Sequence, residues 1–165
     1  MRTAFAFAAA LCATTIVQAR SPAVHNLQSG FDSDVTALSA SQVAGLGTSE
    51  EIVRQYLKRI ADIDDSGPRL NAVIATFPDA IEQARRLDAE RRAGKVRGPL
   101  HGIPVLVKDN IEVAGPIPTT AGSLALNDNI TNRDAPMIAR LREAGAIILG
   151  KTNLSEWANI RPGGS

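Results

Sequence analysis

The sequence has few of the residue types from which many catalytic and metal sites are built. Its 165 residues include one cysteine and two histidines. The cysteine, Cys12, lies in an apolar run at the N-terminus, so the rest of the sequence offers no disulfide, thiolate ligand or cysteine nucleophile. His25 and His101 are far apart and give zinc no ligand set. The sequence therefore indicates neither a metal nor another cofactor.

Aromatic residues and excess charge are also scarce. Aromatics make up 4% of the chain and the net charge is +1, so there is no stacking platform for bases and no basic surface for nucleic acid. The arginines between positions 85 and 92 alternate with acidic residues, a pattern typical of a solvated helix face. We expect no nucleic-acid partner. The 44% hydrophobic content is that of one globular domain with a core, and it does not indicate an oligomeric state.

The first nineteen residues differ in kind from the rest. Met1 and Arg2 form a small positive region, an apolar run follows over 4–17, and Val17-Gln18-Ala19 places small residues at a signal-peptidase site. The run is too short to span a bilayer. We interpret 1–19 as a signal peptide rather than a buried helix, and expect export to the periplasm or medium after cleavage near Ala19. Residues 20–47 are interpreted as an exposed lead-in, with a short helix possible near 35–40.

From Thr48 onward the pattern is that of alternating helices and strands. Thr48 and Glu51 form a capping box at the start of a helix that continues to about Ile63. The acidic residues that follow are interpreted as a solvated helix end, not a cation site, because no loop of calcium-type spacing is present. They are Asp62, Asp64 and Asp65.

The remaining segments predict an α/β architecture. Strands are expected at 70–77, 103–107 and 146–149, the second of them buried on both faces, and helices at 78–94 and 134–145. Asp134 is expected to cap the last helix and Gly145 to end it. The order strand, loop, helix, strand over 103–149 implies a parallel crossover.

Residues 145–152 match the residue pattern of a phosphate-binding loop, but they are not expected to form a loop. Residues 145–152, Gly-Ala-Ile-Ile-Leu-Gly-Lys-Thr, match the pattern Gly, four residues, Gly-Lys-Thr. In a true phosphate loop the four intervening residues leave the strand and turn their N–H groups inward. Here they are the strand itself, and isoleucine resists the positive φ angles that such a cradle uses. We therefore reject this motif.

Two features remain as candidate functional groups. Lys108 emerges at the carboxyl end of the expected strand 103–107, the edge where α/β sheets usually hold ligands; it is either a solvated strand end or a group adapted for chemistry. The long segment 111–133 has no clear period. Its centre, Thr119-Thr120-Ala121-Gly122-Ser123, is rich in small hydroxyl residues that either face a substrate or form a simple turn.

Several of these segments together resemble the amidase signature family of serine hydrolases, in order and in spacing, from about residue 48 to 159. The matching residues are Leu-Asn-Ala-Val-Ile at 70–74, Gly-Pro-Leu-His-Gly-Ile-Pro-Val-Leu-Val-Lys-Asp-Asn at 98–110, Thr-Thr-Ala-Gly-Ser at 119–123 and Gly-Lys-Thr-Asn-Leu-Ser-Glu-Trp at 150–157. The resemblance implies a mixed, mostly parallel sheet with helices packed on it, of which 48–165 would form the N-terminal part.

The resemblance also implies hydrolysis of a non-peptide carboxamide by a Ser–cis-Ser–Lys triad, with Lys108 as general base and a small-molecule amide as substrate. A neutral lysine would deprotonate a bridging serine, which activates the nucleophile for acyl-enzyme formation. Burial at the end of an apolar strand would lower the pKa of a lysine in the required direction. Thr120, Ala121, Gly122 and Ser123 are the expected substrate-binding residues.

The serines of that triad are not found in this sequence. In the family they lie in a Gly-Ser-rich stretch well after the lysine, and Ser165 follows Asn153 too closely to be assigned as the bridging serine. We expect these 165 residues to be inactive alone, as a truncated or frameshifted part of an amidase. Two alternatives are a catalytically dead α/β binding module and the amidase subunit of a tRNA-dependent amidotransferase; an export signal argues against the latter. The substrate amide is not specified.

Overall fold

A computed structural model describes residues 33–158. The predicted signal peptide 1–19, the first part of the lead-in and Ser165 lie outside these residues. The helices are α1 (Val35–Val43), α2 (Ser49–Arg59), α3 (Ala80–Arg92) and α4 (Pro136–Glu143), with a π-helical turn at Ile60–Ser66 and 3-10 turns at Leu124–Leu126 and Glu156–Ala158; the strands are β1 (Val73–Thr76), β2 (Pro104–Lys108) and β3 (Ile147–Thr152). None of the described helices is long and apolar enough to cross a membrane.

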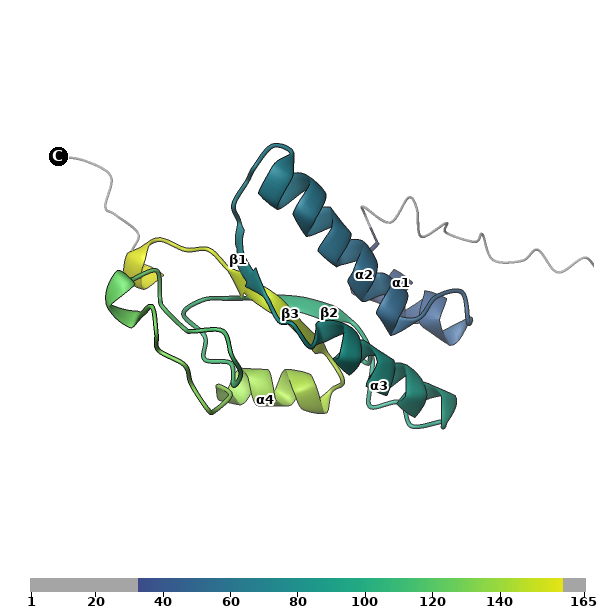
Figure 1. Cartoon of the computed structure of the whole chain (residues 1–165). Coiled ribbons are helices and arrows are strands. Elements are labelled where there is room, and N and C mark those ends of the chain that lie inside the picture. The colour runs from purple at the N-terminus through teal and green to yellow at the C-terminus, as the bar shows by residue number, and fades with distance from the viewer. Residues whose placement is uncertain (1–32, 159–165) are drawn as a thin grey trace, which may run out of the picture.

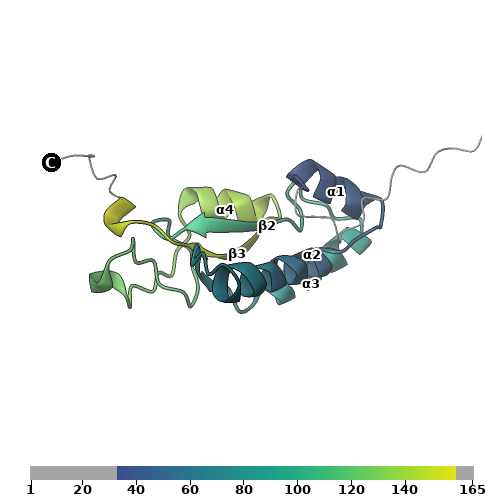
Figure 2. The same ribbon diagram turned by 90° about the horizontal axis from the view of Figure 1, so that it is seen from above.

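The three strands form one mixed sheet in the order β1-β3-β2 (Figure 1). β1 pairs with β3 in the antiparallel sense and β2 pairs with β3 in the parallel sense. Helices α2 and α3 cover one face of the sheet, and α4 lies on the other (Figure 2). The predicted α/β class and the parallel pairing of the strands that precede and follow α4 are confirmed.

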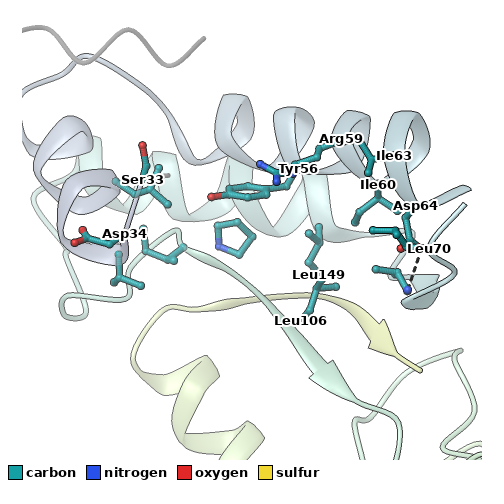
Figure 3. A pocket seen from close by; sticks show the side chains of 15 residues that line it. Ser33, Asp34, Tyr56, Arg59, Ile60, Ile63, Asp64, Leu70, Leu106 and Leu149 are labelled. Carbon is teal, nitrogen blue, oxygen red and sulfur yellow. Dashed lines mark hydrogen bonds between the residues drawn. The ribbon is translucent and has the colours of Figure 1, made fainter. Parts of the chain in front are cut away.

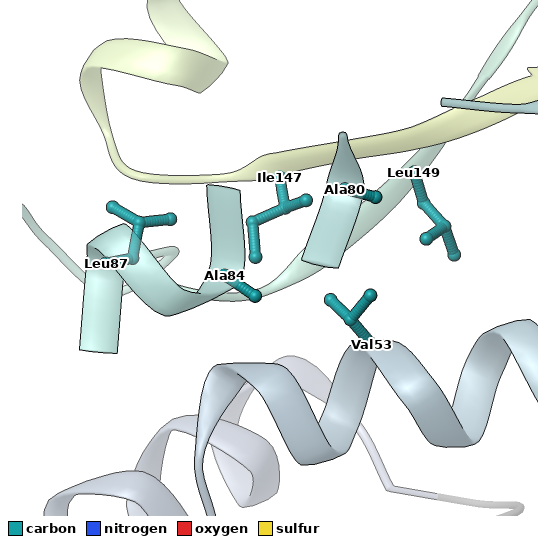
Figure 4. Packing of buried hydrophobic residues seen from close by; sticks show 6 residues of the cluster. All are labelled: Val53, Ala80, Ala84, Leu87, Ile147 and Leu149. Atoms are coloured by element: carbon teal, nitrogen blue, oxygen red, sulfur yellow. The ribbon is translucent and has the colours of Figure 1, made fainter. Parts of the chain in front are cut away.

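The core follows the alternation of side chains along the central strand. Ile147 and Leu149 of β3 pack against α2 and α3 (Figure 4), and Ile148 between them packs against α4 on the opposite face. Successive side chains of a strand point to opposite faces, so a strand covered on both sides reads as a continuous apolar run. The apolar run at 146–149 therefore has a direct structural cause.

The prediction that the strand at 103–107 is buried on both faces is wrong for the described residues. β2 lies at the edge of the sheet and pairs only with β3 among them, and Leu106 is 38% exposed. A run of apolar residues gives no information on how many strands flank it, so sequence alone does not separate a central strand from an edge strand.

The described part of the lead-in is not simply exposed. Most side chains of α1 are accessible, but Leu38 contacts Ile52 and Ile103 in a small apolar cluster. The Gln42 side chain is also buried and donates to the Ser49 hydroxyl at 3.1 Å. The helix that the sequence leaves undecided is therefore part of the packed structure.

The start of α2 is fixed by two sets of hydrogen bonds. The Thr48 hydroxyl accepts from Glu51 N–H, and the Glu51 carboxylate accepts from Thr48 N–H, which confirms the predicted capping box. The Asp88 carboxylate of α3 accepts from Ser49 N–H at 2.8 Å and from Glu50 N–H at 3.1 Å. A carboxylate at a helix N-terminus also interacts favourably with the helix dipole.

Two acidic residues have roles different from those predicted. Asp64 is buried rather than solvated, and its carboxylate accepts from the N–H groups of Ala72 and Val73 at 2.8 and 3.0 Å. Asp134 does not cap α4, whose N-cap is Ala135; its carboxylate accepts from Ala114 N–H and pairs with Arg142. In both cases the carboxylate accepts from backbone N–H groups of another segment, where local sequence rules do not reach.

Asp64→Ala should lower the free energy of unfolding by about 2 kcal/mol, because the N–H groups at the start of β1 lose a charged acceptor. Denaturant titration of the variant and the parent protein measures this. Asp65→Ala is the matched control, since Asp65 is exposed, and its effect should stay within about 0.5 kcal/mol. Equal effects for the two variants would contradict the anchoring role of Asp64.

Glu50 should titrate at unusually low pH. Its carboxylate accepts from Arg85 and from Arg54, which lowers its pKa from 4.5 to about 2. Because the folded-state pKa is depressed, the stabilising contribution of Glu50 is present above about pH 4.5 and is lost as pH falls towards 2. Arg85→Gln should raise the pKa of Glu50 in an NMR titration; an unchanged titration curve would contradict the assigned cause.

Candidate active site

Lys108 ends β2 and projects into solvent at the carboxyl end of the strand. Its backbone is held in the ladder opposite Thr152, and its carbonyl accepts from Ile111 N–H at 3.0 Å. The side chain is exposed. The burial expected from sequence is therefore absent among the described residues, because β2 is an edge strand and the lysine is its last residue.

The residue after Lys108 is anchored through its backbone and its side chain. Asp109 is 1% exposed; its N–H donates to Thr152 O at 3.1 Å and its carbonyl accepts from Ala121 N–H at 3.0 Å. Carboxylate oxygen Oδ2 accepts from the N–H and the hydroxyl of Thr120. Oδ1 lies 3.1 Å from the Lys151 ammonium. The sequence alone assigns Asp109 no role.

Lys151 is the buried lysine of this site. It lies in β3 with no exposed side-chain surface, and its ammonium donates to Ile111 O at 2.6 Å and to the Thr119 hydroxyl at 3.1 Å in addition to the ion pair with Asp109. Burial lowers the pKa of Lys151, and the contact with Asp109 opposes that change. The partners occupy the ammonium, and Gly150-Lys151 continue the strand, which agrees with rejection of the phosphate loop.

The predicted substrate-binding residues form a tight turn beside this ion pair. Ala121 and Gly122 both have positive φ angles, 50° and 73°. The Gly122 N–H donates to the Thr120 hydroxyl, and the Ala121 carbonyl accepts from Trp157 N–H at 2.7 Å. Ser123 is buried, at 7% exposed. Left-handed backbone in non-glycine residues costs free energy and is often found at functional sites.

The structure brings the turn at Thr120–Ser123 next to the end of β2 through Asp109. The contacts run through Asp109, whose carboxylate accepts from Thr120 N–H and whose carbonyl accepts from Ala121 N–H. The turn is therefore fixed to the residue that directly follows Lys108, and the Lys108 side chain itself is exposed.

An apolar groove of about 600 Å³ lies on the face of the sheet covered by α2 (Figure 3). Tyr56 and Ile60 line one side, and Leu106 and Leu149 line the sheet side. By strand alternation, Leu106 and Lys108 share a face of β2. No cluster of three or more metal-ligating side chains occurs in the part of the chain that the structure describes.

These features define a class of protein: an α/β domain with an exposed lysine at the carboxyl end of a strand and a small-residue turn bound to the residue that follows it. The Amidase family model matches residues 51–163, so the chain belongs to the amidase family. The crystal structure of peptide amidase from Stenotrophomonas maltophilia is similar, with a TM-score of 0.75 and 54% identity over 78% of this chain and 26% of that one.

Relatives of known sequence agree with this family. A Schizosaccharomyces pombe protein named as an amidase is 43% identical over 79% of this chain and 22% of its own length. A glutamyl-tRNA(Gln) amidotransferase subunit from Salinispora arenicola is 42% identical over 76% of this chain and 26% of its own length. The chain thus spans about a quarter of the length of these relatives.

Proposed function

We propose that the protein hydrolyses a non-peptide carboxamide through a serine acyl-enzyme, with Lys108 as the general base. The observation that carries this proposal is the placement of Lys108: an accessible amine at the carboxyl end of β2, on a backbone fixed by the contacts of Asp109. Family membership supports amide hydrolysis in general. A small-molecule amide is the proposed substrate.

In the proposed mechanism the amine of Lys108 accepts a proton from a bridging serine. The bridging serine then takes the proton of the nucleophilic serine, whose oxygen attacks the amide carbon. The C–N bond then breaks, the leaving nitrogen receives the proton as ammonia or an amine, and water hydrolyses the ester. The two serines are proposed to follow the described residues, so we expect residues 1–165 expressed alone to show no turnover.

The turn at 120–123 is proposed to bind the substrate. The N–H and the hydroxyl of Thr120 both donate to Asp109. Thr120 would therefore contribute to substrate binding by fixing the backbone of the turn. The positive φ angles of Ala121 and Gly122 let this backbone pass close to Leu154 and Glu156, where a Cβ on Gly122 would lie 3.1 Å from Glu156 Cα.

A second candidate is the amidase subunit of a tRNA-dependent amidotransferase, which the likeness to the Salinispora protein favours. The two candidates differ in location, because we also propose that residues 1–19 direct export, whereas amidotransferase chemistry is cytoplasmic. N-terminal sequencing of the protein from a periplasmic or culture fraction should begin near Arg20. Recovery of the intact N-terminus from the cytoplasm alone would favour the second candidate.

The test of the proposed function uses the polypeptide encoded by the complete reading frame. Ammonia or amine release from simple carboxamides should occur without tRNA or partner subunits, and intact-mass measurement after rapid quenching should show an acyl adduct. Absence of release from a folded protein would overturn the proposal. Reading the gene past Ser165 also shows whether a Gly-Ser-rich continuation is encoded.

A further inference from the structure

The ion pair between Asp109 and Lys151 lies in the interior of the described residues. Both side chains are almost fully excluded from solvent. Removing two charges from water costs several kcal/mol, and replacing a buried pair by apolar residues is often neutral or stabilising. Buried ionic groups can also fix the relative placement of the segments that carry them.

The geometry specified here is the arrangement of three segments at one edge of the sheet. Lys151 belongs to β3, its partners Asp109 and Ile111 follow β2, and its third partner, Thr119, begins the turn at 119–123. The other carboxylate oxygen of Asp109 binds Thr120 in the same turn. One pair of charges therefore holds the end of β2, the end of β3 and the turn together.

This arrangement also determines where Lys108 points. The N–H, the carbonyl and Oδ2 of Asp109 form hydrogen bonds, and Oδ1 forms the ion pair with Lys151, so the backbone next to Lys108 cannot rotate without breaking several contacts. Lys108 directly precedes this fixed backbone, and its side chain is exposed. The pair thus acts on Lys108 through the chain and does not touch it.

We propose that Asp109 and Lys151 are positioning residues of the amidase site: their ion pair fixes the turn at 119–123 relative to Lys108, so that base and substrate-binding backbone are held in one geometry. This inference rests on the proposed function, because it takes Lys108 as the base. It assigns no proton transfer to Lys151, whose ammonium is occupied by protein acceptors.

The test compares Asp109→Asn, Lys151→Met and the double variant in the polypeptide of the complete reading frame. Each single change leaves a buried polar group without its partner, so both Tm and kcat should fall. The double variant removes both charges and should recover most of the Tm. Its kcat should stay roughly ten- to a hundredfold low with KM changed less than about threefold, as expected when reacting groups are displaced by about 1 Å.

The exposed ion pair between Lys58 and Asp62 provides the matched control. The double variant Asp62→Asn/Lys58→Met makes the same chemical change on the surface and should leave kcat and Tm unaltered. Recovery of kcat together with Tm in the Asp109/Lys151 double variant would show a merely structural pair and overturn the inference. Retained activity in Lys108→Met would instead overturn the proposed role of Lys108, whatever the pair does.

If the double variant does not fold, Thr119→Val provides a milder test. It removes one acceptor of the Lys151 ammonium and keeps the side-chain shape nearly unchanged. A lower kcat at unchanged KM and near-unchanged Tm supports the positioning role, and an unchanged kcat contradicts it.

Discussion

Lys108→Met should reduce kcat/KM for amide hydrolysis by a factor of roughly 10² to 10⁴, the contribution typical of a positioned general base. Methionine keeps most of the length of the side chain but cannot accept a proton. Because Lys108 is exposed, the substitution should leave Tm unchanged. Steady-state kinetics and thermal unfolding of the complete polypeptide, side by side, measure the two effects.

Lys95→Met is the appropriate control, because Lys95 is also exposed and lies just after α3, away from the site. Its kinetics should match those of the parent protein. Lys108→Arg should be as inactive as Lys108→Met, since arginine keeps the positive charge but is not deprotonated in proteins. Substantial activity in the arginine variant would indicate that the lysine acts by charge alone and would contradict the general-base mechanism.

Much of the local structure can be predicted because its causes are local. The capping box of Thr48 and Glu51, the apolar run of β3 and the glycine that follows α4 each act within a few residues of where they occur. The resemblance of the motifs to amidases likewise predicts the family to which the chain belongs. These local features do not depend on contacts with distant parts of the chain.

The remaining features depend on contacts between distant segments. The sequence around Asp64 predicts a solvated carboxylate, because no local pattern indicates that the N–H groups at the start of β1 donate to it. Lys151 stands out in the sequence as part of a rejected phosphate motif and of the matching segment 150–157, and neither assigns it a role, although a lysine within a buried strand requires an acid or other acceptors nearby. Its partner Asp109 follows a different strand, and the pairing of β2 with β3 brings the two together.

Gly150 of β3 is required for close approach of β1, and Gly150→Ala should be strongly destabilising. A Cβ atom there would lie 2.4 Å from Ala75 O and 3.2 Å from Thr76 Cα. Both are backbone atoms of the neighbouring strand, so the strands must separate to admit the methyl group. Overpacking of this kind costs about 3 kcal/mol at the upper end of its usual range, which corresponds to a fall in Tm of roughly 10 °C.

Gly98→Ala separates this steric effect from the general effect of replacing glycine. A Cβ atom at Gly98 would meet only Ala144 O, at 3.8 Å, so the free energy of unfolding should change by less than about 0.5 kcal/mol. Denaturant unfolding of the two variants gives the comparison directly. A small effect at Gly150 would mean that β1 can move away from β3 at little cost. In that case the close pairing of β1 with β3 would not explain why residue 150 is a glycine.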